Sequence, residues 1–90
     1  MFDKLFQAQQ KAEEIKKRLD TISVSGEAEG GLIKVTSTAN KEIKSISIDP
    51  AFHAEAELEE LEELLVVAIN KALQQAESVS QTEMQAATKD

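Results

Sequence analysis

The stretch from residue 25 to 50, SGEAEGGLIKVTSTANKEIKSISIDP, decides the fold of this chain. It contains β-branched residues that alternate with polar ones, separated by two turn signals, Gly30-Gly31 and Asn40-Lys41. Alternation with a period of two is typical of strands that bury one face, and turn residues between such runs favour hairpins. The stretch therefore predicts a three-stranded antiparallel meander.

The third strand of this meander has an irregular pattern. Ile43 is out of phase with Ile46 and Ile48. Either the strand bulges near Lys44, or Ile43 faces the other side of the sheet. The sheet is expected to end at Asp49-Pro50, because proline cannot donate a ladder hydrogen bond and suits the first turn of a helix.

A helix is predicted on each side of the sheet. From Leu5 to Ile22 apolar residues recur in steps of three and four, which predicts a helix from about Asp3 to Asp20. A second long helix follows Pro50, and residues 64–69 within it are all apolar. One small sheet covers only one side of such a helix, so we expect a second copy of the chain to cover the rest. The predicted dimer interface is Leu64, Val66, Val67, Ile69 and Leu73. Residues 80–90 lack the apolar pattern and are expected to form a flexible tail.

The composition restricts the class of protein. Ninety residues fit a single domain, here residues 1–90. There is no cysteine, and the one histidine, His53, has no nucleophile context, so neither an enzyme, a metal site nor a cofactor is expected. The N-terminus has no apolar run long enough for a signal peptide, so we expect a cytoplasmic protein.

Charge is distributed unevenly along the chain. The net charge is −7, and all of it lies after Pro50, because residues 1–50 carry eight cations and eight acids. On the first helix three cations lie seven residues apart with two more beside them, and the sheet adds three weaker candidates for phosphate contact. The candidate DNA-binding residues are Lys4, Lys11, Lys16, Lys17, Arg18, Lys34, Lys41 and Lys44. The alternative interpretation is an ordinary solvated helix with Glu13–Lys17 and Glu14–Arg18 pairs.

The order of these segments resembles a known family. The matching segments are Gln7-Ala8-Gln9-Gln10, Gly26-Glu27, Gly30-Gly31-Leu32-Ile33-Lys34-Val35, residues 45–50 and residues 65–73. Together they are similar to the YbaB/EbfC family of bacterial nucleoid-associated proteins. The resemblance implies an α+β fold, α-β-β-β-α, that forms a homodimer with protruding helices and binds double-stranded DNA at the nucleoid, with no membrane or small-molecule partner.

Two features depart from that family. Members often continue into a tail rich in Gly, Met and Pro, whereas this sequence ends in Thr88-Lys89-Asp90. Six glutamates between residues 55 and 63 make the start of the second long helix strongly acidic. The leading hypothesis is a homodimer that binds duplex DNA mainly through backbone phosphates. The alternative is an acidic dimeric interaction module that docks a basic protein partner.

Overall fold

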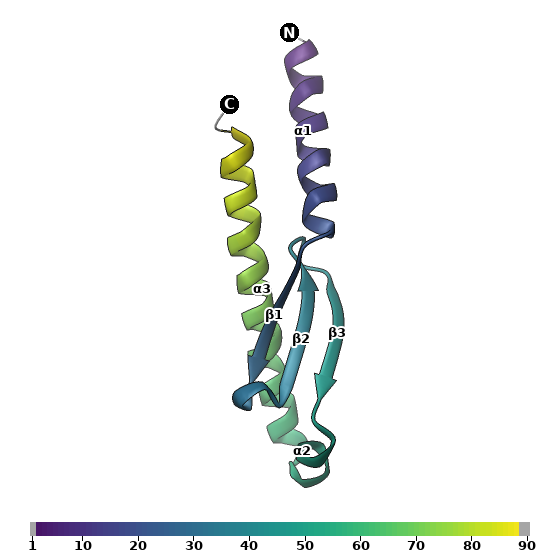
Figure 1. Ribbon diagram of the computed structural model, residues 1–90, viewed down its shortest axis with the longest axis vertical. Coiled ribbons are helices and arrows are strands. Elements are labelled where there is room, and N and C mark those ends of the chain that lie inside the picture. Colours follow the sequence, from purple (N-terminus) through teal and green to yellow (C-terminus); the bar gives the residue numbers. More distant parts are fainter. Residues whose placement is uncertain (1, 89–90) are drawn as a thin grey trace.

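The computed structural model describes residues 2–88 and has the predicted α+β order (Figure 1). A long helix precedes the sheet, and a short and a long helix follow it. The elements are α1 (Phe2–Asp20), β1 (Ser23–Ala28), the 3₁₀ turn η1 (Glu29–Gly31), β2 (Ile33–Thr38), β3 (Ile43–Ile48), α2 (Pro50–Glu55) and α3 (Leu58–Thr88).

The three strands form one antiparallel sheet in the order β1-β2-β3. Thr36 pairs with Ser45 whereas Ser37 pairs with Ile43, so Lys44 is the extra residue of a bulge. The bulge returns Ile43 to the face of Ile46, which confirms the first of the two alternatives for this strand.

The β1–β2 connection uses both glycines in left-handed conformations. Gly30 has φ 63° and Gly31 has φ 95°, as expected for the predicted turn, and Glu29 before them also has a positive φ of 52°. Glycine adopts this region without a steric penalty. The two glycines therefore reverse the chain at the end of β1.

One face of the sheet packs on α3, mainly through β1 and β2. Ile33 and Val35 of β2 are fully buried, and so are Ala68, Ala72 and Ala76 of α3. Small side chains on this stripe of α3 let the helix lie close to β1. The strand β3 lies at the edge of the sheet, where Ile43 and Ile46 stay 38% and 48% exposed.

The apolar stretch of α3 is divided between the core and the surface. Leu64 and Ile69 are partly buried and pack against the chain's own sheet core, and Leu73 is partly buried as well. Val66 and Val67 remain 57% and 41% exposed. Because the sheet covers only one side of this helix, the two valines are the residues of the predicted dimer interface with the most surface left to cover.

Capping and pattern explain where the last helices begin and end. The Asp49 side chain accepts a hydrogen bond of 3.0 Å from the backbone N–H of Phe52 and so caps α2, which starts at Pro50. Residues 80–88, where the sequence predicts a flexible tail, are helical in the structure, and α3 ends at Thr88. Residues 80–88 contain no Gly or Pro, and Ser80 and Met84 lie beside α1. Residues 89 and 90 are outside the described part.

The molecule is long and thin, with extents of 61 × 18 × 17 Å. Helix α1 does not cover the sheet. It projects beyond it, antiparallel to the C-terminal half of α3, and the two helices contact near the base of α1 (Figure 1). Leu19 at that base is buried, whereas Leu5 and Phe6 further out are 66% and 61% exposed. No helix in the described range is long and apolar enough to cross a membrane.

Candidate nucleic-acid interface

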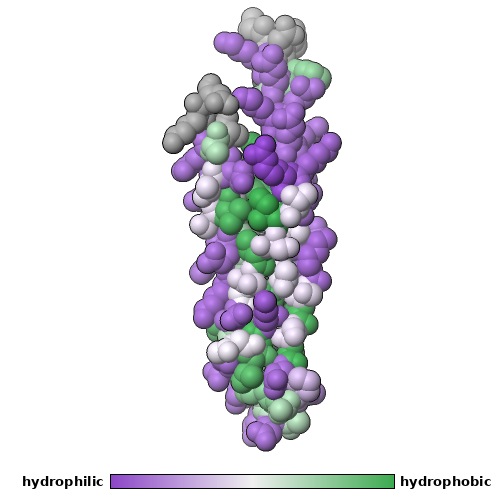
Figure 2. Space-filling model, viewed as in Figure 1, coloured by the Kyte–Doolittle hydropathy of each residue, from purple (hydrophilic) through white to green (hydrophobic). Residues whose placement is uncertain are grey.

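Three cations form a line on the projecting helix α1. Lys4, Lys11 and Arg18 are spaced by seven residues, which is nearly two helical turns, so they share one side of the helix over about 21 Å. We call them the basic row. All three are exposed, and Lys16 and Lys17 beside them are exposed too. In Figure 2 hydrophilic residues cover most of α1.

The alternative interpretation of these charges is an ordinary solvated helix with favourable i,i+4 pairs. Neither Glu13–Lys17 nor Glu14–Arg18 forms one, although all four residues are described. The exposed cations of this helix are therefore not held in these two pairs. The only cation of the basic row that has an ion-pair partner among the described residues is Arg18, and that partner lies on another helix.

The base of α1 is fixed to the turn between β2 and β3. Asn40 Nδ2 donates hydrogen bonds to the Lys16 carbonyl oxygen at 2.7 Å and to Asp20 Oδ1 at 2.6 Å. Thr21 Oγ1 donates to the Arg18 carbonyl oxygen at 2.7 Å. The Arg18 carbonyl belongs to the last four of α1, which have no partner within the helix, and the Asn40 side chain adds two bonds between this end of α1 and the β2–β3 turn. The side chain of Asn40, together with the buried Leu19, thus holds the base of α1 in place.

Two ion pairs connect α3 to the cations around this base. Arg18 Nη1 lies 3.1 Å from Glu83 Oε2 on α3, and Lys41 in the β2–β3 turn pairs with Glu77 on α3. The hydrogen bond from Lys41 and then its positive charge lower the pKa of Glu77, and a further hydrogen bond from Gln81 acts in the same direction. Neither pair could be predicted from the sequence, because their members are far apart in the chain.

The lysines of the sheet are not brought together with the basic row. Lys34 is exposed and lies on the face of β2 opposite to the buried Ile33 and Val35, away from α3. Lys44 is exposed at the bulge, and its Nζ lies 3.0 Å from Glu42 Oε1. Of the three sheet lysines proposed as contacts, only Lys41 is held near α1, through its turn.

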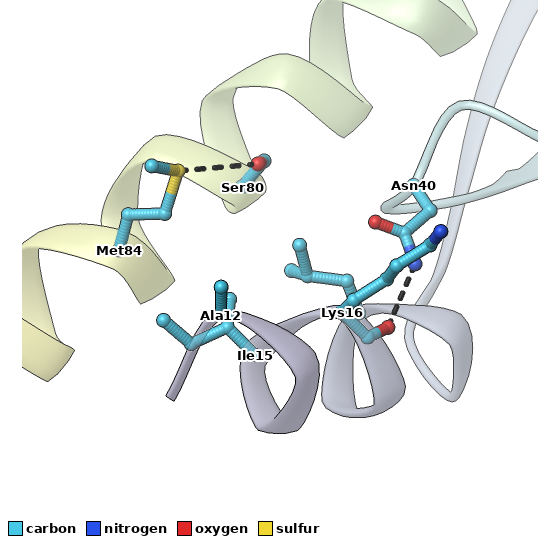
Figure 3. A pocket seen from close by; sticks show the side chains of 7 residues that line it. Ala12, Ile15, Lys16, Asn40, Ser80 and Met84 are labelled. Carbon is cyan, nitrogen blue, oxygen red and sulfur yellow. Dashed lines mark hydrogen bonds between the residues drawn. The ribbon is translucent and has the colours of Figure 1, made fainter. Parts of the chain in front are cut away.

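An apolar cleft of about 310 Å³ lies between α1 and α3 above the sheet (Figure 3). Apolar residues of both helices gather there in Figure 2. The lining residues are Ala12, Ile15, Lys16, Leu19, Asn40, Ser80 and Met84. Met84 accepts a hydrogen bond from Ser80 Oγ at 4.0 Å. The cleft shows that the two helices diverge from their contact near Leu19.

A dense group of acidic residues lies at the opposite end of the molecule. Six glutamates, here called the acidic end, occupy the end of α2, the link that follows it and the start of α3: Glu55, Glu57, Glu59, Glu60, Glu62 and Glu63. Figure 1 places this region at the bottom, whereas α1 projects from the top of the sheet. Helix α1 itself carries five cations and four acids, a net charge of +1. Among the described residues no group of three or more His, Cys, Asp or Glu side chains converges on a possible metal position.

Comparison with known proteins identifies relatives along the whole chain. Nucleoid-associated proteins of Flavobacterium johnsoniae and Afipia carboxidovorans are 45% and 41% identical to it, over 86 and 88 residues. The aligned regions cover 96% and 98% of this chain, and 79% and 84% of the two relatives. A nucleoid-associated protein of Bordetella avium is 44% identical over 85 residues, which cover 91% of this chain and 78% of that protein.

A solved structure shares the architecture. The crystal structure of an uncharacterized protein of Helicobacter pylori superposes with a TM-score of 0.78 at 15% identity and covers 91% of this chain and 86% of that one. At 15% identity this similarity shows a shared fold only. The profile of the YbaB/EbfC DNA-binding family matches residues 1–90. The chain therefore belongs to the YbaB/EbfC DNA-binding family.

Proposed function

We propose that this protein is a cytoplasmic, nucleoid-associated homodimer that binds double-stranded DNA mainly through phosphate contacts from α1. The observation that carries the proposal is the exposed basic row Lys4, Lys11 and Arg18 on a helix that projects from the body. Cations in such a row neutralise phosphates and release condensed counterions, which is the sequence-independent part of DNA affinity.

The net charge of −7 is compatible with DNA binding, because the negative charge is concentrated far from α1. The acidic end and α1 lie on opposite sides of the sheet in a molecule 61 Å long. At physiological ionic strength the Debye length is about 8 Å, so charges at one end are largely screened at the other. A DNA duplex on α1 therefore meets the local charge of that helix rather than the charge of the whole chain.

The dimer is supported by apolar surface that a single chain leaves uncovered. On β3 the half-exposed Ile43 and Ile46 lie on a strand with a free edge, and an edge of this kind is prone to pairing with another chain. On α3 the exposed Val66 and Val67 add further uncovered apolar surface. Two copies would present two basic rows, and their contacts would add on the same duplex.

Base-specific recognition is expected to be minor. Lysine and arginine contacts to phosphates position a protein on DNA but do not read its sequence. The chain has no Trp or Tyr that could stack on unpaired bases. Unrelated duplexes should therefore bind with similar affinity.

The test is a fluorescence anisotropy titration with two unrelated duplexes over a range of salt concentrations. If three cations per chain contact phosphates in a dimer, the slope of log affinity against log salt is expected to be about −5. The double substitution Lys11→Gln and Arg18→Gln should weaken binding to both duplexes to the same extent and make the slope shallower by about 3 to 4.

A matched double substitution at the acidic end, Glu59→Gln and Glu62→Gln, provides the control. It changes two charges as well, but should leave DNA affinity unchanged or slightly raised. Absence of duplex binding by the parent would contradict the proposal and would favour the interaction module, in which those glutamates dock a basic protein. Parent binding that the Lys11 and Arg18 changes do not weaken would show that α1 is not the contact surface.

A further inference from the structure

The C-terminal half of α3 places a carboxylate on one cation of the basic row. Glu83 Oε2 lies 3.1 Å from Arg18 Nη1, across 65 residues of sequence. Six residues earlier on α3, Glu77 pairs with Lys41 of the β2–β3 turn. From residue 64 to 88 these two glutamates are the only acids of α3, and both point at a cation of another element.

A carboxylate in this position resembles a bound phosphate. Both are anions that accept charge-assisted hydrogen bonds from a guanidinium at about the same distance. Arg18 keeps 59% of its side-chain surface exposed, so a duplex can reach it, but the Nη1 group already has an anionic partner. A phosphate that binds this group must replace Glu83 or share the guanidinium with it.

We propose that Glu83, with Glu77 in a supporting role, is a built-in competitor that sets the DNA affinity of α1. The inference rests on the proposed function and adds an intramolecular acid that opposes it. Within the described residues, Glu83 and Glu77 link α3 to the predicted DNA-binding cations, and the two other acids near this base, Asp20 and Glu42, bond to Asn40 and Lys44 instead.

A purely structural role predicts the opposite sign. If the Arg18–Glu83 pair mainly held α1 in its binding orientation, its loss would lower DNA affinity. The orientation of α1 is, however, already fixed by Asn40 and by the buried Leu19. The pair itself is solvent-exposed, and exposed ion pairs contribute little to stability. Loss of Glu83 is therefore expected to free Arg18 rather than to release the helix.

A double-mutant cycle with duplex DNA tests the proposal. The four proteins are the parent, Glu83→Gln, Arg18→Gln and the double variant, each titrated by anisotropy at several salt concentrations. Glu83→Gln is expected to raise affinity about two- to fivefold, the range of a surface ion pair. In the Arg18→Gln background the same change should have no effect, because the competitor acts only through Arg18.

Glu63→Gln is the matched control. It is the same chemical change on the same helix, at the acidic end, and should leave affinity unchanged. Circular dichroism and sedimentation of each variant confirm that the fold and the assembly are retained.

The outcomes separate the two proposals. Unchanged or lower affinity of Glu83→Gln, with a parent that binds and an Arg18→Gln variant that binds less, overturns the competitor and leaves the proposed function intact. If Glu83→Gln still raises DNA affinity in the Arg18→Gln background, the competitor is also overturned, because the gain then comes from the change in overall charge. If the parent and all variants fail to bind duplex DNA, the proposed function fails, and the competitor fails with it.

Discussion

Gly26 allows strand β1 to touch the backbone of α3. A Cβ atom at this position would lie 2.3 Å from the carbonyl oxygen of Ala68 and 2.3 Å from the backbone nitrogen of Ala72. Backbone atoms of a helix cannot move aside as the end of a flexible side chain can. The close contact between sheet and helix therefore depends on a missing side chain, together with the alanine stripe that faces it.

We expect Gly26→Ala to lower the free energy of unfolding by about 3 kcal/mol, because the added methyl forces the strand and helix apart. Urea denaturation measures this change. The control is Gly30→Ala, where the added methyl meets nothing within 4 Å and the cost of about 1 kcal/mol comes only from the positive φ. Equal losses in the two variants would show that contact with α3 is not tight in solution.

At the scale of elements, α3 joins the two ends of the molecule. Its first turns carry part of the acidic end, its middle covers the sheet, and its last turns contact cations near α1. The ion pair between Glu77 and Lys41 ties α3 to the β2–β3 turn, the same turn whose Asn40 holds α1. One turn thus connects both helices.

This arrangement predicts a pH dependence of stability. Because Lys41 lowers the pKa of Glu77 in the folded protein, the pair stabilises the fold above the ordinary glutamate pKa, and this contribution is lost as the pH falls through the lowered value. The parent should be more stable than Glu77→Gln at neutral pH, and the difference should vanish in acid. Urea denaturation at a series of pH values measures it, with Glu63→Gln as the control for the loss of one charge. A difference that stays constant with pH would contradict the prediction.

The sequence predicted the elements better than their contacts. Period-two runs around Gly30-Gly31 and Asn40-Lys41 have local causes, so the strands could be predicted from the sequence. The bulge at Lys44 remained one of two alternatives until the pairing with β2 was known. The helical residues 80–88 could not, because their apolar pattern is weak and their contacts with α1 come from the tertiary fold. The basic row follows from helical spacing, whereas Glu83 at Arg18 depends on how two distant helices meet.

At the scale of the whole molecule, one chain leaves part of its apolar surface open. The sheet has one helix on one face, β3 is an edge strand, and the inner face of β3 extends beyond the reach of α3. In a single chain this surface faces water. A second copy that covers it would turn two thin molecules into one body with two projecting α1 helices.

We expect Ile46→Asp and Val67→Asp each to raise the dissociation constant of the dimer a hundredfold or more, about 3 kcal/mol, because each buries a charge in the interface. Both side chains are about half exposed in the single chain, so the fold of the monomer should tolerate them. Sedimentation velocity at micromolar concentration measures the shift.

The matched control for this change is Ser47→Asp, on the same strand but on the opposite face. It should leave the assembly as it is in the parent. A parent that sediments as a folded monomer would contradict the dimer, and dissociation caused by Ser47→Asp alone would place the interface on the outer face of the sheet.

The separation of charge along the 61 Å axis gives each chain a permanent dipole moment. In the field of a polyanion such a dipole experiences a torque that turns the glutamates away and brings α1 to the front before contact is made. A larger share of diffusional encounters then begins in the productive orientation. Since salt screens this field, added salt should slow association as well as speed dissociation.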